Sequence, residues 1–295
     1  EIAHGSAVNT IDDIIERFDI CEADRAIGIS ALDFDLSVFD LFGMLSAGGS
    51  LAIIPDEKRK EPEYWKMLID EHNITVWNTV PALFEMLMIY SNPDDGLANL
   101  RLVLVSGDWV KPNLYKELRM RSNHCRFIAL GGATEASIWS IFYEYKNKED
   151  WWQSIPYGKP LSNQGFMILD KKMQECPIGV KGELYIRGKG VAKGYYNEPE
   201  TTEKSFIKFK NGETIYKTGD YGRYMKDGNI EFLGRIDNQI KVHGYRIELG
   251  EIESALRSLD YVKDCVVVAT SENLKEKNIY SLVVVNKENV SEERI

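Results

Sequence analysis

The residues best suited to chemistry lie in one short segment. Gly131 and Gly132 directly follow an apolar run, and after one alanine the chain continues with Thr134 and Glu135. Glycine lets a backbone approach a ligand closely, a threonine hydroxyl can bond a phosphate oxygen, and a glutamate carboxylate can hold a hydrated Mg²⁺. Alone, the segment is as typical of a turn between a strand and a helix, so its interpretation depends on the rest of the chain.

Further segments also place glycines beside polar residues. They are 182–188 with 194–196, then 216–220, and then 234–248. Asp220 could accept hydrogen bonds from both hydroxyls of a ribose, although Thr-Gly-Asp by itself is more often a turn. The charges of Arg235 and Asp237 suit a polar hinge or a solvated loop, and segment 182–188 by itself indicates only a hairpin.

Composition restricts the class of protein. The chain has 295 residues, 44% of them hydrophobic and 28% charged, which is enough for one large domain or two ordinary ones. A net charge of -10 argues against nucleic-acid or membrane partners, and no stretch has the length of a membrane span or the pattern of a signal peptide. We therefore expect a cytoplasmic protein, and, because residue 1 is Glu rather than Met, a fragment.

Hydrophobic periodicity indicates the elements that must position these segments. Up to about residue 150, apolar strands alternate with helical patterns, which predicts a parallel sheet covered on both faces. The expected strands are 26–31, 51–54, 74–80, 101–105 and 126–130, and the expected helices are 7–18, 37–45, 63–71, 81–90 and 112–121. Short strands with turn signals then predict a mainly antiparallel region, followed by a small α+β module. The strands expected in the antiparallel region are 165–169, 182–187, 214–218, 222–225 and 229–233.

In this order and at these spacings, the segments resemble the adenylate-forming superfamily, most closely the amino-acid adenylation domains of nonribosomal peptide synthetases. Phe34-Asp35-Leu36-Ser37 favours this branch over acyl-CoA synthetases and luciferases. The resemblance covers essentially the whole chain and implies the α/β fold of adenylate-forming enzymes. It assigns 1–236 to the later part of the large subdomain (α/β 1–150, mainly β 151–236) and 237–295 to the hinge and a truncated small subdomain.

The resemblance implies a ligase that uses ATP and Mg²⁺. Such domains form an aminoacyl-adenylate, release pyrophosphate, and pass the aminoacyl group to the phosphopantetheine thiol of a peptidyl carrier domain, next to other synthetase domains. Thr134 would contact the phosphate, Glu135 would help to hold Mg²⁺, and Asp237 would be the hinge between the subdomains. The implied nucleotide-binding residues are Gly132, Thr134, Asp220 and Arg235.

The resemblance also implies an amino-acid pocket. Asp35 would pair with the α-amino group of the substrate. The implied wall consists of Leu36, Phe39, Asn78, Leu104, Ser106, Leu130, Ile138 and Trp139. Taken singly, its aliphatic members are more typical of plain core packing. Because the wall offers no countercharge, a charged substrate side chain would be costly to bury. The set resembles the pocket of cysteine-activating domains, so we expect L-cysteine, with serine and small aliphatic amino acids as alternatives.

The sequence departs from the family pattern in several places. It contains neither the Ser/Thr/Gly-rich phosphate loop nor the lysine that bridges substrate carboxylate and phosphate. Gly131 stands where relatives usually place a ring that stacks on adenine, so we expect adenine to be held less tightly, or by another residue. Without a cation that neutralises transition-state charge, these residues alone are expected to activate nothing at a useful rate. A non-catalytic remnant or split subunit that binds a carrier protein stays open, as does an acyl-CoA-type ligase, which Asp35 disfavours.

Overall fold

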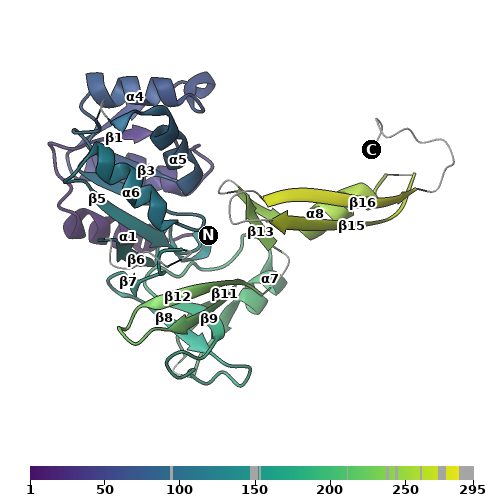
Figure 1. The fold of residues 1–295 in the computed structure, drawn as a ribbon. Coiled ribbons are helices and arrows are strands. Elements are labelled where there is room, and N and C mark those ends of the chain that lie inside the picture. The colour runs from purple at the N-terminus through teal and green to yellow at the C-terminus, as the bar shows by residue number, and fades with distance from the viewer. Residues whose placement is uncertain are drawn as a thin grey trace. The chain divides into compact units, whose positions relative to one another are not determined.

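The structure is a computed structural model that describes residues 1–93, 96–146, 152, 154–210, 212–236, 239–242, 245–259, 261–271 and 277–285. The chain divides into two compact units, Glu1–Gly234 and Arg235–Ile295 (Figure 1). No helix in these ranges is both long and apolar enough to cross a membrane.

A mixed seven-stranded sheet forms the centre of the first unit, with the strand order β2-β1-β3-β4-β5-β6-β7. Its strands are β1 (Arg25–Gly28), β2 (Ser50–Ile53), β3 (Val76–Thr79), β4 (Leu102–Val105), β5 (Arg126–Gly131), β6 (Ile141–Glu144) and β7 (Lys159–Pro160). Strands β1 to β5 pair in parallel, whereas β6 and β7 join in antiparallel fashion. The expected α/β fold with a parallel sheet is confirmed.

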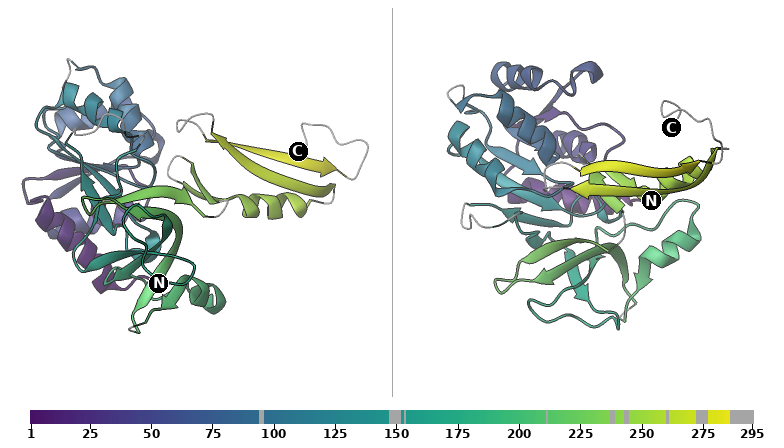
Figure 2. Two further views of the ribbon diagram at one scale, coloured as in Figure 1. Left: turned by 60° about the horizontal axis from the view of Figure 1, so that its bottom comes forward. Right: turned by 45° about the vertical axis from the view of Figure 1, so that its right-hand side comes forward.

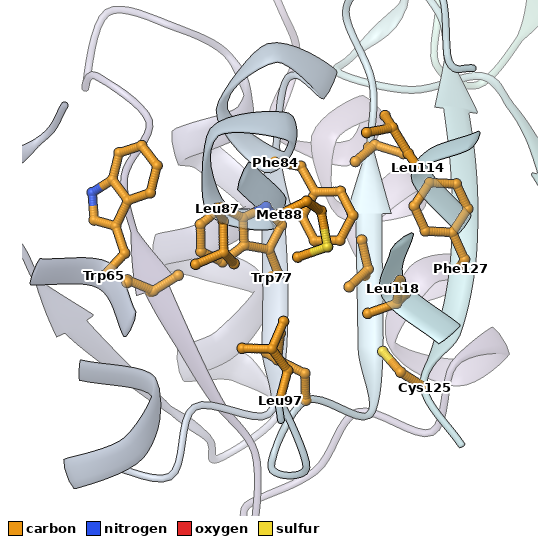
Figure 3. Close-up of a cluster of buried hydrophobic side chains, with 14 of the residues drawn as sticks. Trp65, Trp77, Phe84, Leu87, Met88, Leu97, Leu114, Leu118, Cys125 and Phe127 are labelled. Carbon is orange, nitrogen blue, oxygen red and sulfur yellow. The ribbon is translucent and has the colours of Figure 1, made fainter. Parts of the chain in front are cut away.

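Helices cover both faces of this sheet, as the alternation of strands and helices predicted. They include α1 (His4–Arg17), α4 (Pro62–Glu71), α5 (Pro81–Tyr90) and α6 (Pro112–Arg121). Prolines begin the last three, where the first helical turn does not need the missing N–H. Because strand side chains alternate between faces, Trp77 and Phe127 enter the core beneath α4, α5 and α6 (Figure 3), whereas Leu104 and Leu130 enter the core on the opposite face, with α1.

The segment expected as one helix over 37–45 contains a π-helical turn. It consists of α2 (Leu36–Val38), the π turn η1 (Phe39–Gly43) and α3 (Met44–Ser46). The N–H of Met44 donates to the carbonyl of Phe39, five residues back. A Cβ at Gly43 would lie 2.7 Å from a ring carbon of Phe39, so glycine allows that ring to pack against the turn. Single π turns often occur at functional sites.

A second, antiparallel sheet completes the first unit, with the order β10-β11-β9-β8 and β12 paired with β11. Its strands are β8 (Gln164–Leu169), β9 (Gly182–Gly188), β10 (Phe206–Lys208), β11 (Thr214–Tyr224) and β12 (Ile230–Arg235), and the short helix α7 (Pro199–Ser205) precedes β10. The sequence indicated separate strands at 214–218 and 222–225, which is wrong. A register shift between Lys217 and Tyr221, with Gly219 at φ +72°, lets one bulged strand run through the segment.

The described residues of the second unit form two hairpins and one helix. It is built from β13 (Gln239–Val242), β14 (Tyr245–Glu248), α8 (Leu249–Arg257), β15 (Val262–Ser271) and β16 (Lys277–Val285). Figure 2 shows α8 running along the β15–β16 hairpin. Arg257 donates to the carbonyl of Cys265 at 2.7 Å, and the N–H of Val267 donates to Glu253 at 2.9 Å, so side chains of α8 fix the helix on β15.

Candidate active site

A hydrogen bond links two residues that the sequence places 99 positions apart. The hydroxyl of Thr134 donates to Oδ2 of Asp35 at 2.6 Å. Asp35 directly precedes α2, and Thr134 opens the short 3-10 helix η4 (Thr134–Ala136) that follows β5. The structure therefore brings together the side chain expected to bind an α-amino group and the side chain expected to contact a phosphate.

The expected site residues gather at one edge of the parallel strands. Asn78 lies near the end of β3, Ser106 directly follows β4, and Gly132 directly follows β5. These are the carboxyl ends of adjacent strands in an open α/β sheet, where ligands usually bind. The topology explains why residues between Asp35 and Trp139, about a third of the chain, reach one region.

The backbone of the loop after β5 doubles back on itself. A Cβ at Gly132 would lie 2.9 Å from the N of Ser140 and 2.9 Å from the Cα of Trp139, so only glycine fits there. Ser137 and Ile138 both have positive φ, at 64° and 70°. A left-handed conformation is rare for a β-branched residue and is held only where the surroundings impose it. The loop is thus a preformed, strained feature beside Thr134.

Glu135 is buried and held by a residue to which the sequence assigned no role. The hydroxyl of Tyr195 donates to Oε1 of Glu135 at 2.7 Å. Burial raises the pKa of Tyr195, and the bond to this carboxylate raises it further. The main-chain N–H of Ala192 also donates to the carbonyl of Glu135 at 2.9 Å. The signal was available in the sequence, because segment 194–196 was noted, but only as part of a hairpin.

The expected pocket wall forms one contiguous cluster. Six of its apolar members pack in the same buried core, namely Leu36, Phe39, Leu104, Leu130, Ile138 and Trp139. The rings of Phe39 and Trp139 lie 5.2 Å apart, inclined by 57°. The indole N–H of Trp139 donates to the hydroxyl of Ser106 at 3.0 Å, which fixes the orientation of the indole.

Asn78 adds a buried polar pair to this wall. Its Nδ2 donates to Oδ1 of Asp40 at 2.8 Å and reaches the carbonyl of Leu36 at 3.5 Å. Asp40 is 2% exposed, and burial raises its pKa to about 8, although the bond from Asn78 opposes the shift. Within the described part of the protein, Oδ2 of Asp40 and Oδ1 of Asn78 have no hydrogen-bond partner. The sequence alone does not indicate Asp40 as part of this wall, because its burial beside Asn78 depends on the packing of β3.

The remaining expected residues belong to the second sheet or follow it. Asp220 lies inside the bulge of β11, where its N–H donates to the hydroxyl of Thr218 at 3.0 Å. That hydroxyl donates to the carbonyl of Leu184 at 2.8 Å, which ties the bulge to β9. Arg235 is the last residue of β12. Asp237 lies outside the described residues.

The residues available for a metal ion are few. Where side chains are described, no group of three or more His, Cys, Asp or Glu residues gathers to hold an ion. Mg²⁺ commonly takes only one or two protein carboxylates and completes its shell with water and substrate phosphates. Glu135, directly after Thr134, fits that limited role.

Comparisons with known proteins bear on the family and the fold of this chain. The family model described as "AMP-binding enzyme" matches residues 1–196. Bacitracin synthase 1 of Bacillus licheniformis is 47% identical over 286 residues, which is 96% of this chain and 5% of that protein. The chain thus spans only a small part of this relative.

Two solved structures are also similar. The Vibrio cholerae adenylation domain AlmE, in complex with glycyl-adenosine-5'-phosphate, aligns with a TM-score of 0.87 at 27% identity, over 97% of this chain and 55% of that one. Holo-PA1221, a nonribosomal peptide synthetase protein containing adenylation and PCP domains, aligns with a TM-score of 0.83 at 27% identity, over 93% and 48%. These matches confirm the resemblance drawn from the sequence.

Proposed function

Because the chain belongs to the AMP-binding enzyme family, we propose that it is part of an amino-acid-activating domain of a nonribosomal peptide synthetase. In this proposal the domain uses ATP to form an aminoacyl-adenylate and then transfers the aminoacyl group to a phosphopantetheine thiol on a carrier domain. The similarity to bacitracin synthase 1 and to a domain bound to an aminoacyl-adenylate supports the first step. The adenylation and PCP domains of holo-PA1221 support the second.

The hydrogen bond between Thr134 and Asp35 carries the proposal. In an α-amino acid the ammonium and the carboxylate are attached to the same carbon, so the groups that bind them must be close. An anion for the ammonium and a hydroxyl for the phosphate, 2.6 Å apart, meet that requirement. A fatty acid or aryl acid would leave the charge of Asp35 without its cation, which disfavours an acyl-CoA-type ligase.

In this proposal, each of these residues has a role in the reaction. A carboxylate oxygen of the amino acid attacks the α-phosphorus of ATP, a new P–O bond forms, and the bond from the α-phosphorus to the bridging oxygen breaks with release of pyrophosphate. Asp35 accepts hydrogen bonds from the ammonium, so the hydroxyl of Thr134, which donates to Asp35 in the structure, turns its single hydrogen to a phosphate oxygen. Asp220 accepts hydrogen bonds from the ribose hydroxyls. Glu135 would hold Mg²⁺, which neutralises phosphate charge when bound. We also assign Arg235 to the nucleotide and Asp237 to the hinge.

For the substrate, we infer L-cysteine. The wall is apolar except for two neutral polar residues, Asn78 and Ser106, and it carries bulky rings at Phe39 and Trp139. Such a wall suits a short, weakly polar side chain and penalises a charged one. Serine and small aliphatic amino acids follow as weaker substrates.

Amino-acid-dependent exchange of pyrophosphate into ATP tests the proposal. The full-length gene product that contains these 295 residues should support exchange most strongly with cysteine. Strongest exchange with a charged or large aromatic amino acid would contradict the pocket assignment. Exchange with fatty or aryl acids alone would contradict amino-acid activation and favour an acyl-CoA-type ligase. No exchange with any acid would favour a non-catalytic remnant or split subunit.

The isolated 295 residues are a separate case. Since they contain neither the phosphate loop nor the bridging lysine, we propose that they do not activate amino acids at a useful rate. Exchange should appear only with the full-length product. Comparable exchange by residues 1–295 alone would show that those two elements are dispensable.

A further inference from the structure

A ring from elsewhere in the chain lies directly on the backbone of Gly131. A Cβ at this position would lie 1.8 Å from Cε2 of Tyr157 and 2.6 Å from both its Cδ2 and its Cζ. Gly131 is the last residue of β5, and its φ is not in the left-handed range that favours glycine. The backbone conformation therefore does not require glycine here. The ring of Tyr157 is what excludes any side chain.

Tyr157 belongs to a half-buried aromatic cluster beside the loop that follows β5. Its ring lies 5.6 Å from that of Phe232, which lies 4.7 Å from that of Trp109. These three rings, here named the aromatic cluster, come from β12, from the loop after β4 and from the loop before β7. The hydroxyl of Tyr157 also reaches the carbonyl of Gly132 at 3.5 Å. One ring of the cluster therefore contacts the loop after β5, which contains Gly132 and Thr134.

Such a cluster suits a nucleobase. Bases stack on aromatic side chains, which contribute substantially to binding in a partly desolvated site. A nucleotide whose phosphates lie at Gly132 and Thr134 has its base within one nucleotide length of this loop. Tyr157 and Tyr195 are both partly exposed tyrosines that contact this loop, but the hydroxyl of Tyr195 is bonded to Glu135, whereas the ring of Tyr157 lies against the backbone of Gly131.

We propose that Tyr157 supplies the ring on which the adenine of ATP stacks, in the space that a side chain at Gly131 would otherwise occupy. The inference rests on the proposed function, because it assumes that the loop binds ATP. The sequence suggested that adenine would be held less tightly, or by another residue. The structure assigns Tyr157 as that other residue, because its ring lies on Gly131 although the two residues are 26 positions apart in the chain.

Kinetics of the full-length product test the role of the ring. Tyr157→Ala should raise KM for ATP about ten-fold or more, with little change in KM for the amino acid. Tyr157→Phe should behave like the natural protein, because stacking needs the ring and not the hydroxyl. Tyr115→Ala is the matched control. It removes a partly buried tyrosine that lies on α6 and packs against Phe127, and it should leave KM for ATP unchanged.

Exchanging the two positions gives a sharper test. Gly131→Tyr alone should abolish activity, since two rings cannot share the space. Gly131→Tyr combined with Tyr157→Gly should restore KM for ATP to within a few-fold of the natural value. A purely structural role for Tyr157 would lower stability and affect both substrates, and rescue by a ring at 131 would not be selective for ATP.

Two results would overturn the inference. One is a Tyr157→Ala variant that exchanges with an unchanged KM for ATP. The other is a double variant that folds but does not recover ATP affinity beyond that of Tyr157→Ala.

If the natural protein shows no exchange with any amino acid, the proposed function fails instead. Calorimetric titration with ATP alone then decides the inference, which is refuted if Tyr157→Ala binds as tightly as the natural protein.

Discussion

The buried carboxyl of Asp40 makes the stability of this protein depend on pH, and Asp40→Asn should remove that dependence. Burial raises the pKa of Asp40 to about 8 from an ordinary value of 3.8. Between these pH values the folded protein keeps a proton that the unfolded chain has lost. The free energy of unfolding therefore falls as pH rises, by about 1.4 kcal/mol per pH unit, and levels off above the folded pKa.

The structure sets the size of the effect. From pH 5 to pH 8 the loss amounts to about 4 kcal/mol, a large share of the stability of an ordinary domain. Asparagine has nearly the shape of a protonated carboxyl group, can still accept the bond from Nδ2 of Asn78, and does not ionise. The variant should therefore gain stability relative to the natural protein as pH rises.

Urea unfolding at pH 5, 6, 7 and 8 measures this difference. All 6 tryptophans of the sequence precede residue 153, so tryptophan fluorescence reports on the first unit. The difference in unfolding free energy between variant and natural protein should grow by about 1.4 kcal/mol per pH unit. Taking the difference cancels the titration of other groups. Parallel stability curves over this range would refute the assignment of a neutral Asp40.

Asp24 is a matched control, because folding lowers its pKa whereas folding raises that of Asp40. It is equally buried, and although burial raises its pKa, hydrogen bonds from Arg101 and Thr75 lower the net pKa below the ordinary value. Its contribution is thus complete above about pH 4 and is lost only as pH falls further. Asp24→Asn should cost about 3 kcal/mol or more, with no trend between pH 5 and 8.

Three further predictions concern the candidate site. Asp35→Asn should raise KM for the amino acid about ten-fold or more, with KM for ATP little changed, because it removes the anion expected to face the ammonium; exchange kinetics that shift both constants equally would contradict this role. Phe39→Ala removes a fully buried ring that packs on Trp139 and should cost about 3 to 5 kcal/mol in urea unfolding, while exchange with larger amino acids increases. Glu135→Gln keeps an acceptor for Tyr195 but loses the charge, so Mg²⁺ titrations of exchange should show a several-fold higher requirement, and an unchanged requirement would exclude Glu135 as a ligand.

Local patterns in the sequence were sufficient for the main elements. The alternation of apolar strands with helices that begin at Pro81 and Pro112 predicted the parallel sheet, because side-chain periodicity depends only on neighbours along the chain. The helix expected over 37–45 was less exact. The ring of Phe39 and the absence of a side chain at Gly43 together produce a π turn that no simple period describes.

By itself, the sequence was enough to draw the resemblance to the family, and that resemblance singles out Asp35, Thr134 and Glu135 as the groups on which the proposed chemistry depends. Only the tertiary structure decided what these groups meet. Asn78 and Asp40 form a buried pair, Tyr195 bonds Glu135, and the ring of Tyr157 fills the space at Gly131. The physical reason is that a pKa, a hydrogen bond or an excluded side chain depends on burial and on neighbours far away in the chain, and the folding of the sheet and its loops creates both.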